Sequence, residues 1–306
     1  MRRRRSVFGV KRFFFTIMLA LVAVGYQYVR SPSFRRQCNR LVSGWRGDAI
    51  RVPLPKRVAS PVPGGAASGG KSDNLDLGTP GKCDQIVERE GYALGYVEKW
   101  EQAAWVAYRL TKDEVMSRKA SRADAFMPDP EVKTGSATLE DYQGSGYDRG
   151  HLAPAGDMHW SWKAMLESFY MSNMSPQDPS FNRGIWSRLE QAVRRFAHSE
   201  GSVFVVTGPI ITGDEEKTIG ANKVRVPEFY YKVVYDETPP EKMIAFILPN
   251  KGSKKPLDSF VVSVDDVEEA TGLDFFSALS EDMQKRLESN SDANAWTWRD
   301  SRRGGR

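Results

Sequence analysis

The sequence is poor in the residues that build sulfur- and imidazole-based sites. Its 306 residues include two cysteines, Cys38 and Cys83, and three histidines. Two cysteines are too few for a disulfide framework or a thiolate metal site. Three histidines without a paired spacing exclude a zinc site built mainly from imidazoles. Any metal bound by this chain therefore needs oxygen ligands.

Acidic residues are almost absent from the first quarter of the chain. Residues 1–72 carry 15 Lys and Arg but a single acid, Asp48, whereas residues 73–306 carry 29 basic and 38 acidic residues, a net charge of −9. The overall charge of +5 thus describes the N-terminal segment. Basic composition is no argument that the rest of the chain binds nucleic acid, so that case depends on local sites.

Residues 1–52 are predicted to be a targeting leader with an apolar membrane anchor at about 13–29. Those 17 residues reach roughly 25 Å as a helix, the short limit for a bilayer span, and arginines flank them on both sides. Arginine-rich leaders without acids are typical of organelle import. The leader favours the mitochondrial inner membrane or intermembrane space, and a secretory-pathway signal-anchor is the alternative.

Three segments are expected after the leader. Residues 53–82 predict a flexible linker, because 11 of the 29 residues from 53 to 81 are Pro or Gly. Residues 83–290 predict the folded domain, and residues 291–306 a basic tail. In that tail Trp296 and Trp298 either interleave with arginines, as in single-strand binders, or belong to a frayed end.

The domain mixes strands and helices without regular alternation. Apolar runs of strand length occur at 105–110, 203–211, 229–235 and 243–248, and helical segments are expected at 162–171, after Asn182 and at 265–270. This pattern predicts an α+β fold with a central, mainly antiparallel sheet flanked by helices.

The most informative stretch is Asp148-Arg149-Gly150-His151, which is bounded by glycine and proline. These breakers favour a shaped loop or strand end, and Gly150 is expected to let the backbone turn sharply. A neutral histidine can take a proton from water, and an arginine can fork onto two phosphate oxygens. The stretch therefore fits phosphodiester hydrolysis, with an ordinary polar loop as the alternative.

A second polar group follows in Ser172–Gln177 and Phe181–Glu190. Asn182 is placed where a helix N-cap belongs, a role worth about 1 kcal/mol, but its amide oxygen also suits Mg²⁺. Glu190 lies eight residues further, roughly 80° around a regular helix from Asn182. It is therefore expected to orient a metal-bound water rather than to bind the ion directly, or else to be a solvated helix residue.

The Asp-Arg-Gly-His stretch, the Ser-Asn-Met-Ser-Pro-Gln loop and the Asn…Leu-Glu helix together resemble the DNA/RNA non-specific endonuclease family and its mitochondrial endonuclease G branch. The resemblance covers roughly residues 85–285 and implies a ββα-metal finger within a larger α+β body. It implies Mg²⁺ as the cofactor, with Mn²⁺ as a substitute, and DNA and RNA as substrates. The products would carry 5′-phosphate and 3′-hydroxyl ends, and a homodimer is a further expectation.

By position, the resemblance makes His151 the general base and Asn182 the direct metal ligand, with Glu190 acting through water. Asn173 and Arg149 would contact the scissile phosphate. An upstream arginine would do the same, and Arg122 is preferred over Arg118. Asp148 and Gly150 are expected to shape the site. Two other functions stay open: an inactive nucleic-acid binding or tethering protein of this fold, and a phosphodiesterase for another substrate.

Overall fold

The computed structural model describes residues 73–212 and 217–298. The predicted leader, its apolar run at 13–29 and the linker up to residue 72 lie outside the described residues. So do residues 299–306 of the predicted tail. Within the described ranges, no helix is both long and apolar enough to cross a membrane.

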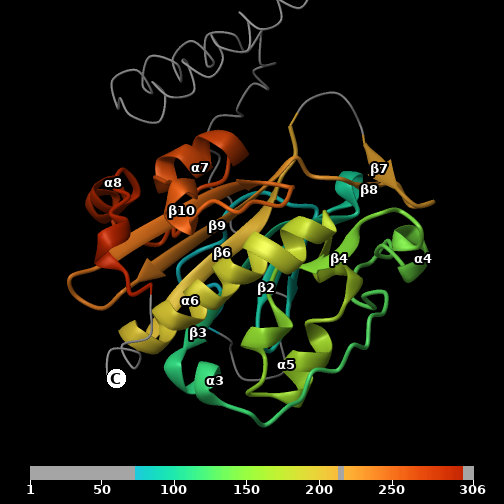
Figure 1. Cartoon of the computed structure of the whole chain (residues 1–306), viewed down its shortest axis with the longest axis horizontal. Coiled ribbons are helices and arrows are strands. Elements are labelled where there is room, and N and C mark those ends of the chain that lie inside the picture. The colour runs from blue at the N-terminus through green and yellow to red at the C-terminus, as the bar shows by residue number, and fades with distance from the viewer. Residues whose placement is uncertain (1–72, 213–216, 299–306) are drawn as a thin grey trace, which may run out of the picture. The chain divides into compact units, whose positions relative to one another are not determined.

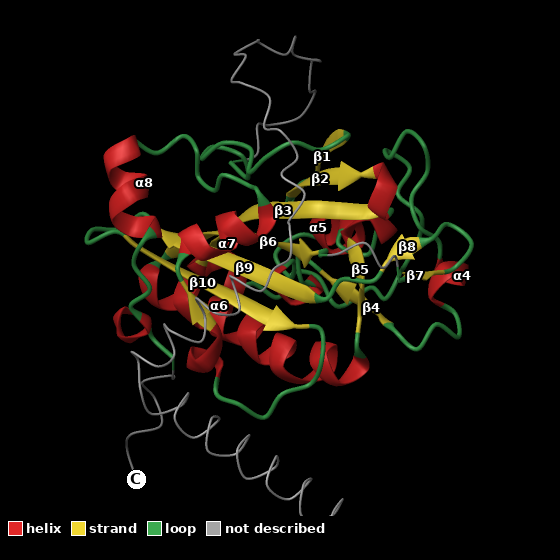
Figure 2. Cartoon of the chain, turned by 90° about the horizontal axis from the view of Figure 1, so that it is seen from above, coloured by secondary structure: helices red, strands yellow, loops and turns green. Residues whose placement is uncertain are grey.

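A seven-stranded antiparallel sheet forms the centre of the described chain (Figures 1 and 2). Its order is β1-β2-β3-β6-β9-β10-β11, and every neighbouring pair is antiparallel. The strands are β1 (Gln85–Glu88), β2 (Ala93–Val97), β3 (Gln102–Thr111), β6 (Ser202–Ile210), β9 (Phe229–Asp236), β10 (Lys242–Pro249) and β11 (Val261–Val262). The four apolar runs predicted as strands correspond to β3, β6, β9 and β10, and the α+β prediction is confirmed.

Two short ribbons stand apart from this sheet. The first pairs β4 (Asp148–His151) with β5 (Met174–Gln177), and the second pairs β7 (Thr218–Ile219) with β8 (Val224–Arg225). The helices are α3 (Lys112–Met116), α4 (Leu139–Tyr142), α5 (Trp162–Glu167), α6 (Ser187–Glu200), α7 (Val264–Thr271) and α8 (Glu281–Glu288). Figures 1 and 2 both show β4 toward one end of the molecule and α8 toward the other.

Both faces of the sheet are buried, because the strands alternate between two apolar cores. Val106 and Val205 point into a core that includes Leu189, Val193 and Phe196 of α6. Their neighbours point the other way, into a second core that contains Val264 and Val267 of α7 and Leu287 of α8. A strand alternates faces with period 2, so seven strands separate α6 from α7 and α8.

Two predicted boundaries differ from the structure. The end of the predicted linker is packed, since Asp73 pairs with Arg109 at 2.9 Å and Leu75 and Leu77 contact the second core. The predicted tail is packed up to residue 298 as well. Trp296 is 4% exposed, and the ring centroids of Trp296 and Trp298 lie 4.8 and 5.3 Å from that of Phe196. Trp296 and Trp298 therefore pack against the core, and this burial accounts for them better than single-strand binding or a frayed end.

Candidate active site

The β4–β5 ribbon carries the Asp-Arg-Gly-His stretch along a single strand. In register, Asp148 faces Gln177 and His151 faces Met174. Arg149 and His151, two positions apart, share a face, and both contact Phe126. A strand rather than a turn therefore aims the two side chains in one direction.

Gly150 has a different role from the one predicted. It lies inside β4, where the backbone does not turn. A Cβ atom at this position would stand 2.1 Å from Cδ of Gln177, far inside van der Waals contact. Glycine is needed here because the side chain of Gln177 crosses the strand.

His151 is enclosed by aromatic rings. Its ring centroid lies 5.8 Å from that of Phe126 and 5.0 Å from that of Phe169. Burial lowers the pKa of His151 to about 3, helped by the positive charges of Arg122 and Arg149 and opposed by Asp124. Nε2 is buried and has no hydrogen-bond partner among the described residues. The imidazole is therefore neutral at pH 7 and able to accept a proton.

Asn182 is held by an acid from the ribbon. Its Nδ2 donates to Oδ2 of Asp148 at 2.9 Å, and Arg183 pairs with both oxygens of the same carboxylate at 2.8 and 2.6 Å. This arrangement agrees with the shaping role predicted for Asp148. Oδ1 of Asn182 accepts no hydrogen bond from any described residue.

The predicted N-cap role of Asn182 is wrong. Residues Phe181–Trp186 form a π-helical turn that leads into α6, and Asn182 lies inside it. Gly184 has non-helical angles, φ −108° and ψ −106°, so the start of the helix is irregular. The roughly 80° calculated between Asn182 and Glu190 on a regular helix therefore does not apply. Such π-turns occur frequently at functional sites.

Glu190 belongs to a group of buried charges that the sequence did not predict. Arg194, four residues further on α6, pairs with Asp157 at 2.6 Å, and Asp157 also accepts a 3.0 Å hydrogen bond from Tyr108. Lys232 of β9 is fully buried, with its ammonium 4.9 Å from the Trp186 ring centroid. Two sequence features indicate this group: the i, i+4 spacing of Glu190 and Arg194, and one lysine within the apolar run of β9.

The group shifts the pKa of Glu190 upward. Burial raises the pKa of Glu190 to about 7, while Arg194 and Lys232 oppose the rise and Asp157 adds to it. Burial likewise lowers the pKa of Lys232 to about 8, against the attraction of Glu190. The charge of Arg122 acts on both Glu190 and His151. Glu190 of α6 and His151 of β4 thus both lie close enough to the Arg122 guanidinium for its charge to lower their pKa values.

Two upstream arginines, Arg122 and Arg118, were predicted as alternative contacts for the phosphate. Arg122 is exposed and has its guanidinium 5.0 Å from the Phe169 ring centroid, beside the ring of His151. The rival Arg118 donates to the carbonyls of Val115 and Ser117, and its charge is not among the main ones acting on His151 or Glu190. The geometry therefore favours Arg122.

Asn173 is placed behind the site. It is fully buried, its Oδ1 accepts from the backbone N–H of Ala153, and its Nδ2 donates to the carbonyls of Ala153 and Ser168. Every polar group of its side chain is engaged, so the expected direct contact with phosphate does not fit this geometry. Asn173 instead fixes the chain that follows His151.

The donor set fits a hard divalent cation. Oδ1 of Asn182 and the half-buried carboxylate of Glu190 are oxygen donors, and hydrogen bonds from described residues occupy neither. Mg²⁺ takes one or two protein oxygens and keeps several waters, which matches so small a set. No sulfur or imidazole donor is needed.

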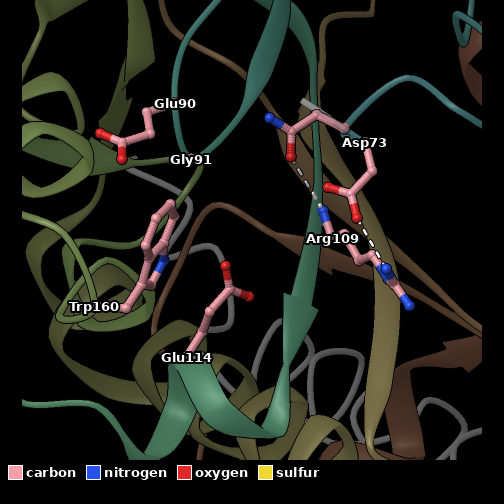
Figure 3. A pocket seen from close by; sticks show the side chains of 7 residues that line it. Asp73, Glu90, Gly91, Arg109, Glu114 and Trp160 are labelled. Carbon is pink, nitrogen blue, oxygen red and sulfur yellow. Dashed lines mark hydrogen bonds and ion pairs between the residues drawn. The ribbon is translucent and has the colours of Figure 1, made fainter. Parts of the chain in front are cut away.

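A separate cavity of about 350 Å³ lies away from these residues (Figure 3). Its lining residues are Asp73, Asn74, Glu90, Gly91, Arg109, Glu114 and Trp160. None of the predicted site residues lines it. Its acids are already in use: Asp73 pairs with Arg109, and Glu114 accepts the capping bond from the N–H of Thr111.

Comparison with known proteins agrees with this site. The family model described as DNA/RNA non-specific endonuclease matches residues 70–282. Nuclease C1 of Cunninghamella echinulata var. echinulata is 39% identical over 67% of this chain and 88% of its own length. Endonuclease G, mitochondrial, of Bos taurus is 34% identical over 73% and 80%, respectively. Human nuclease EXOG, mitochondrial, is 37% identical, and the match spans 58% of its length.

A solved structure shares the fold. The crystal structure of the EndoG/EndoGI complex contains a chain that superposes with a TM-score of 0.66 at 32% identity, covering 72% of this chain and 96% of that one. The fold is that of a ββα-metal nuclease. The chain belongs to the DNA/RNA non-specific endonuclease family.

Proposed function

We propose that the chain is a Mg²⁺-dependent, sugar-non-specific endonuclease that leaves 5′-phosphate and 3′-hydroxyl ends on DNA and RNA. Family membership supports hydrolysis of nucleic acids. One combination of observations carries the finer proposal. His151 is neutral and enclosed by aromatic rings, and Asn182 donates its Nδ2 to Asp148, so that its amide oxygen accepts no hydrogen bond from a described residue.

In this proposal His151 is the general base. Nδ1 is the ring nitrogen left to meet a water, because Nε2 is buried without a partner. The pKa of about 3 belongs to the free protein, in which burial lowers it most and the charges of Arg122 and Arg149 lower it further. An anionic phosphate beside these arginines offsets their charge, and the imidazole then becomes a stronger base as substrate binds.

The other side chains bind and orient. Asn182 contributes Oδ1 to the cation, and Glu190 acts through water. When bound, the ion would stabilise the charge that develops on the phosphate and the leaving oxygen. Arg122 and Arg149 bind the phosphate. Asp148 positions Asn182, and Asn173 positions the backbone of the residues that follow His151.

The test is a digestion assay with supercoiled plasmid and with RNA, in Mg²⁺, Mn²⁺ and EDTA. We expect both substrates to be cut in the metal buffers and neither in EDTA. His151→Ala should lose at least about 10²-fold in activity while retaining substrate binding. The matched control is His159→Ala, because His159 bonds the carbonyl of Ala120 at 2.7 Å and serves packing. Binding without cleavage by the parent chain would instead support a tethering protein, and cleavage unaffected by EDTA would reject the metal.

We also propose that the chain works in mitochondria, at the inner membrane or in the intermembrane space. The supporting observations are the acid-poor leader and the relatives that are themselves named mitochondrial. The membrane anchor at about 13–29, the homodimer and the domain limit at 52 stay predictions.

A further inference from the structure

Helices α7 and α8 bring three carboxylates together. One carboxylate oxygen from each of Asp265, Glu268 and Glu288 lies within 4.8 Å of the others. Asp265 and Glu268 are three residues apart on α7 and so share a face, while Glu288 is the last residue of α8. Figures 1 and 2 show α8 at the end of the molecule opposite β4, so this cluster is separate from the active site.

Glu288 distinguishes this cluster from an ordinary acidic surface. Its side chain is 6% exposed, and Oε1 is buried with no hydrogen-bond partner among the described residues. Leaving a buried carboxylate oxygen unpaired is costly. Glu268, in contrast, accepts a 2.8 Å hydrogen bond from the N–H of Phe275 with its own Oε1. One carboxylate of the cluster therefore has an oxygen without a partner, which a ligand could supply.

In the described part of the chain, no cation is among the charges that act most on Glu288. The charges that act most on it are those of Glu268, Asp265 and Asp274, all negative. The basic side chain next to it in α8, Arg286, reaches away to Glu241 at 3.4 Å. Burial and these like charges raise the pKa of Glu288 to about 7. A bound divalent cation would remove both the repulsion and the unpaired oxygen.

We propose that Asp265, Glu268 and Glu288 form a second divalent-cation site, specific for Ca²⁺. Ca²⁺ binds oxygens at about 2.3–2.6 Å, so ligands on opposite sides of the ion stand roughly 4.6–5.2 Å apart. The span of the cluster falls within that limit. Ca²⁺ also tolerates irregular ligand geometry, whereas Mg²⁺ demands a near-ideal octahedron at about 2.0–2.1 Å. Carboxylates from two separate helices suit the more tolerant ion.

The site would be structural. Of the eight residues in α8, only Leu287 and Glu288 are buried, so apolar contact holds this helix weakly. An ion bound by Glu288 and by the two acids of α7 would link α8 to α7. Glu268 also accepts a hydrogen bond from the N–H of Phe275, so the ion would stabilise that loop as well. Because such an ion binds the folded chain alone, it stabilises that state by mass action.

The experiment measures Ca²⁺ binding by calorimetry and thermal unfolding on the full chain carrying Asn182→Ala, which removes the proposed catalytic ligand. We expect one Ca²⁺ to bind and to raise Tm, with Mg²⁺ binding at least about tenfold more weakly. Adding Glu288→Gln should weaken Ca²⁺ binding by at least about tenfold and abolish the Tm rise, because the charge count of the ligands sets the affinity.

Asp265→Asn serves as a second variant, since Asp265 is exposed and its replacement leaves the core untouched. It should weaken Ca²⁺ binding in the same direction. The matched control is Glu281→Gln, which removes an exposed carboxylate from the other end of α8 and should change nothing. Absence of Ca²⁺ binding, or equal binding with and without Glu288→Gln, would overturn the proposal. Neither result affects the nuclease function.

Discussion

Asn182 donates a 2.9 Å hydrogen bond from Nδ2 to Oδ2 of Asp148, and this bond fixes the direction of the amide. The two residues are 34 positions apart, one on a strand and the other in a π-helical turn. Arg183 holds the same carboxylate from outside with two hydrogen bonds. The amide oxygen of Asn182 is thereby left open for a cation.

Asp148→Ala should lower nuclease activity about 10- to 100-fold, the usual effect of losing a group that orients a metal ligand. The Mg²⁺ concentration for half-maximal rate should rise as well, because the amide is then free to rotate. Titrating Mg²⁺ in a plasmid assay measures both effects. Arg183→Met is the control: it removes an exposed partner of Asp148, whose ion pair is screened by solvent, and keeps the bond to Asn182. Equal losses in the two variants would contradict a role through Asn182.

The contribution of His151 to the stability of the metal-free chain should fall as the pH drops below about 6.5. His151 has a folded-state pKa of about 3 and an unfolded value of about 6.5, so the unfolded chain binds the extra proton first. The loss begins near pH 6.5, continues toward pH 3 and is absent above pH 7. At pH 5 it should be about 1–2 kcal/mol.

Glu190 and Glu288, whose pKa values are raised to about 7, act in the opposite direction, so urea unfolding of the parent and of His151→Ala at pH 7.5 and pH 5, in EDTA, isolates this loss. His151→Ala creates a cavity whose cost is the same at both pH values, so the change in stability from pH 7.5 to pH 5 should be about 1–2 kcal/mol more favourable in the variant than in the parent. A difference that matches the parent would mean that His151 is protonated normally in the folded chain.

Much of the fold could be predicted because local patterns determine it. The apolar runs that became β3, β6, β9 and β10 alternate between two cores and required no knowledge of their partners. Order along the sheet depends on pairings between distant residues, such as Val106 with Thr207, which periodicity does not reveal.

The site was predicted less completely, for three physical reasons. Gly150 was assigned to a turn because its true constraint, the side chain of Gln177, comes from the partner strand. Asn182, predicted as the metal ligand, was also placed at an N-cap position, because a π-turn leaves the same residue types at a helix start as a regular N-terminus. Asn173 was predicted to touch phosphate, although its amide is saturated by backbone groups that only the folded chain brings near it.

Removing residues 1–52 should release an active enzyme from membranes. The predicted apolar anchor and the arginine-rich leader lie wholly within that segment, and all site residues lie beyond it. A fluorescent fusion of residues 1–60 should enter mitochondria, because arginines without acids respond to an inside-negative potential. Co-localisation with mitochondrial and endoplasmic-reticulum markers measures the outcome. Entry into the secretory pathway would reject mitochondrial import and leave the nuclease proposal standing.

Lys232 is a buried cation whose charge acts on Glu190, a proposed site residue. Its ammonium makes no hydrogen bond with a described residue, and its attraction to Glu190 lowers the pKa of that carboxyl. Lys232→Met should therefore raise the pKa of Glu190 above its present value of about 7. Since Glu190 must be ionised to act through water on the cation, a rise of about one pKa unit should lower kcat/KM about fivefold at pH 7, and kcat/KM should recover to within about threefold at pH 9.

The pH profile separates this role from a purely structural one. Methionine matches the shape of the lysine stem and removes an ammonium that makes no hydrogen bond with a described residue. The control is Lys242→Met on the neighbouring strand, where the ammonium pairs with Glu200 at 3.0 Å and Asp236 at 3.4 Å. That variant should leave the dependence of kcat/KM on pH between pH 7 and pH 9 unchanged. If Lys232→Met lowers kcat/KM equally at pH 7 and pH 9, Lys232 does not act through the ionisation of Glu190.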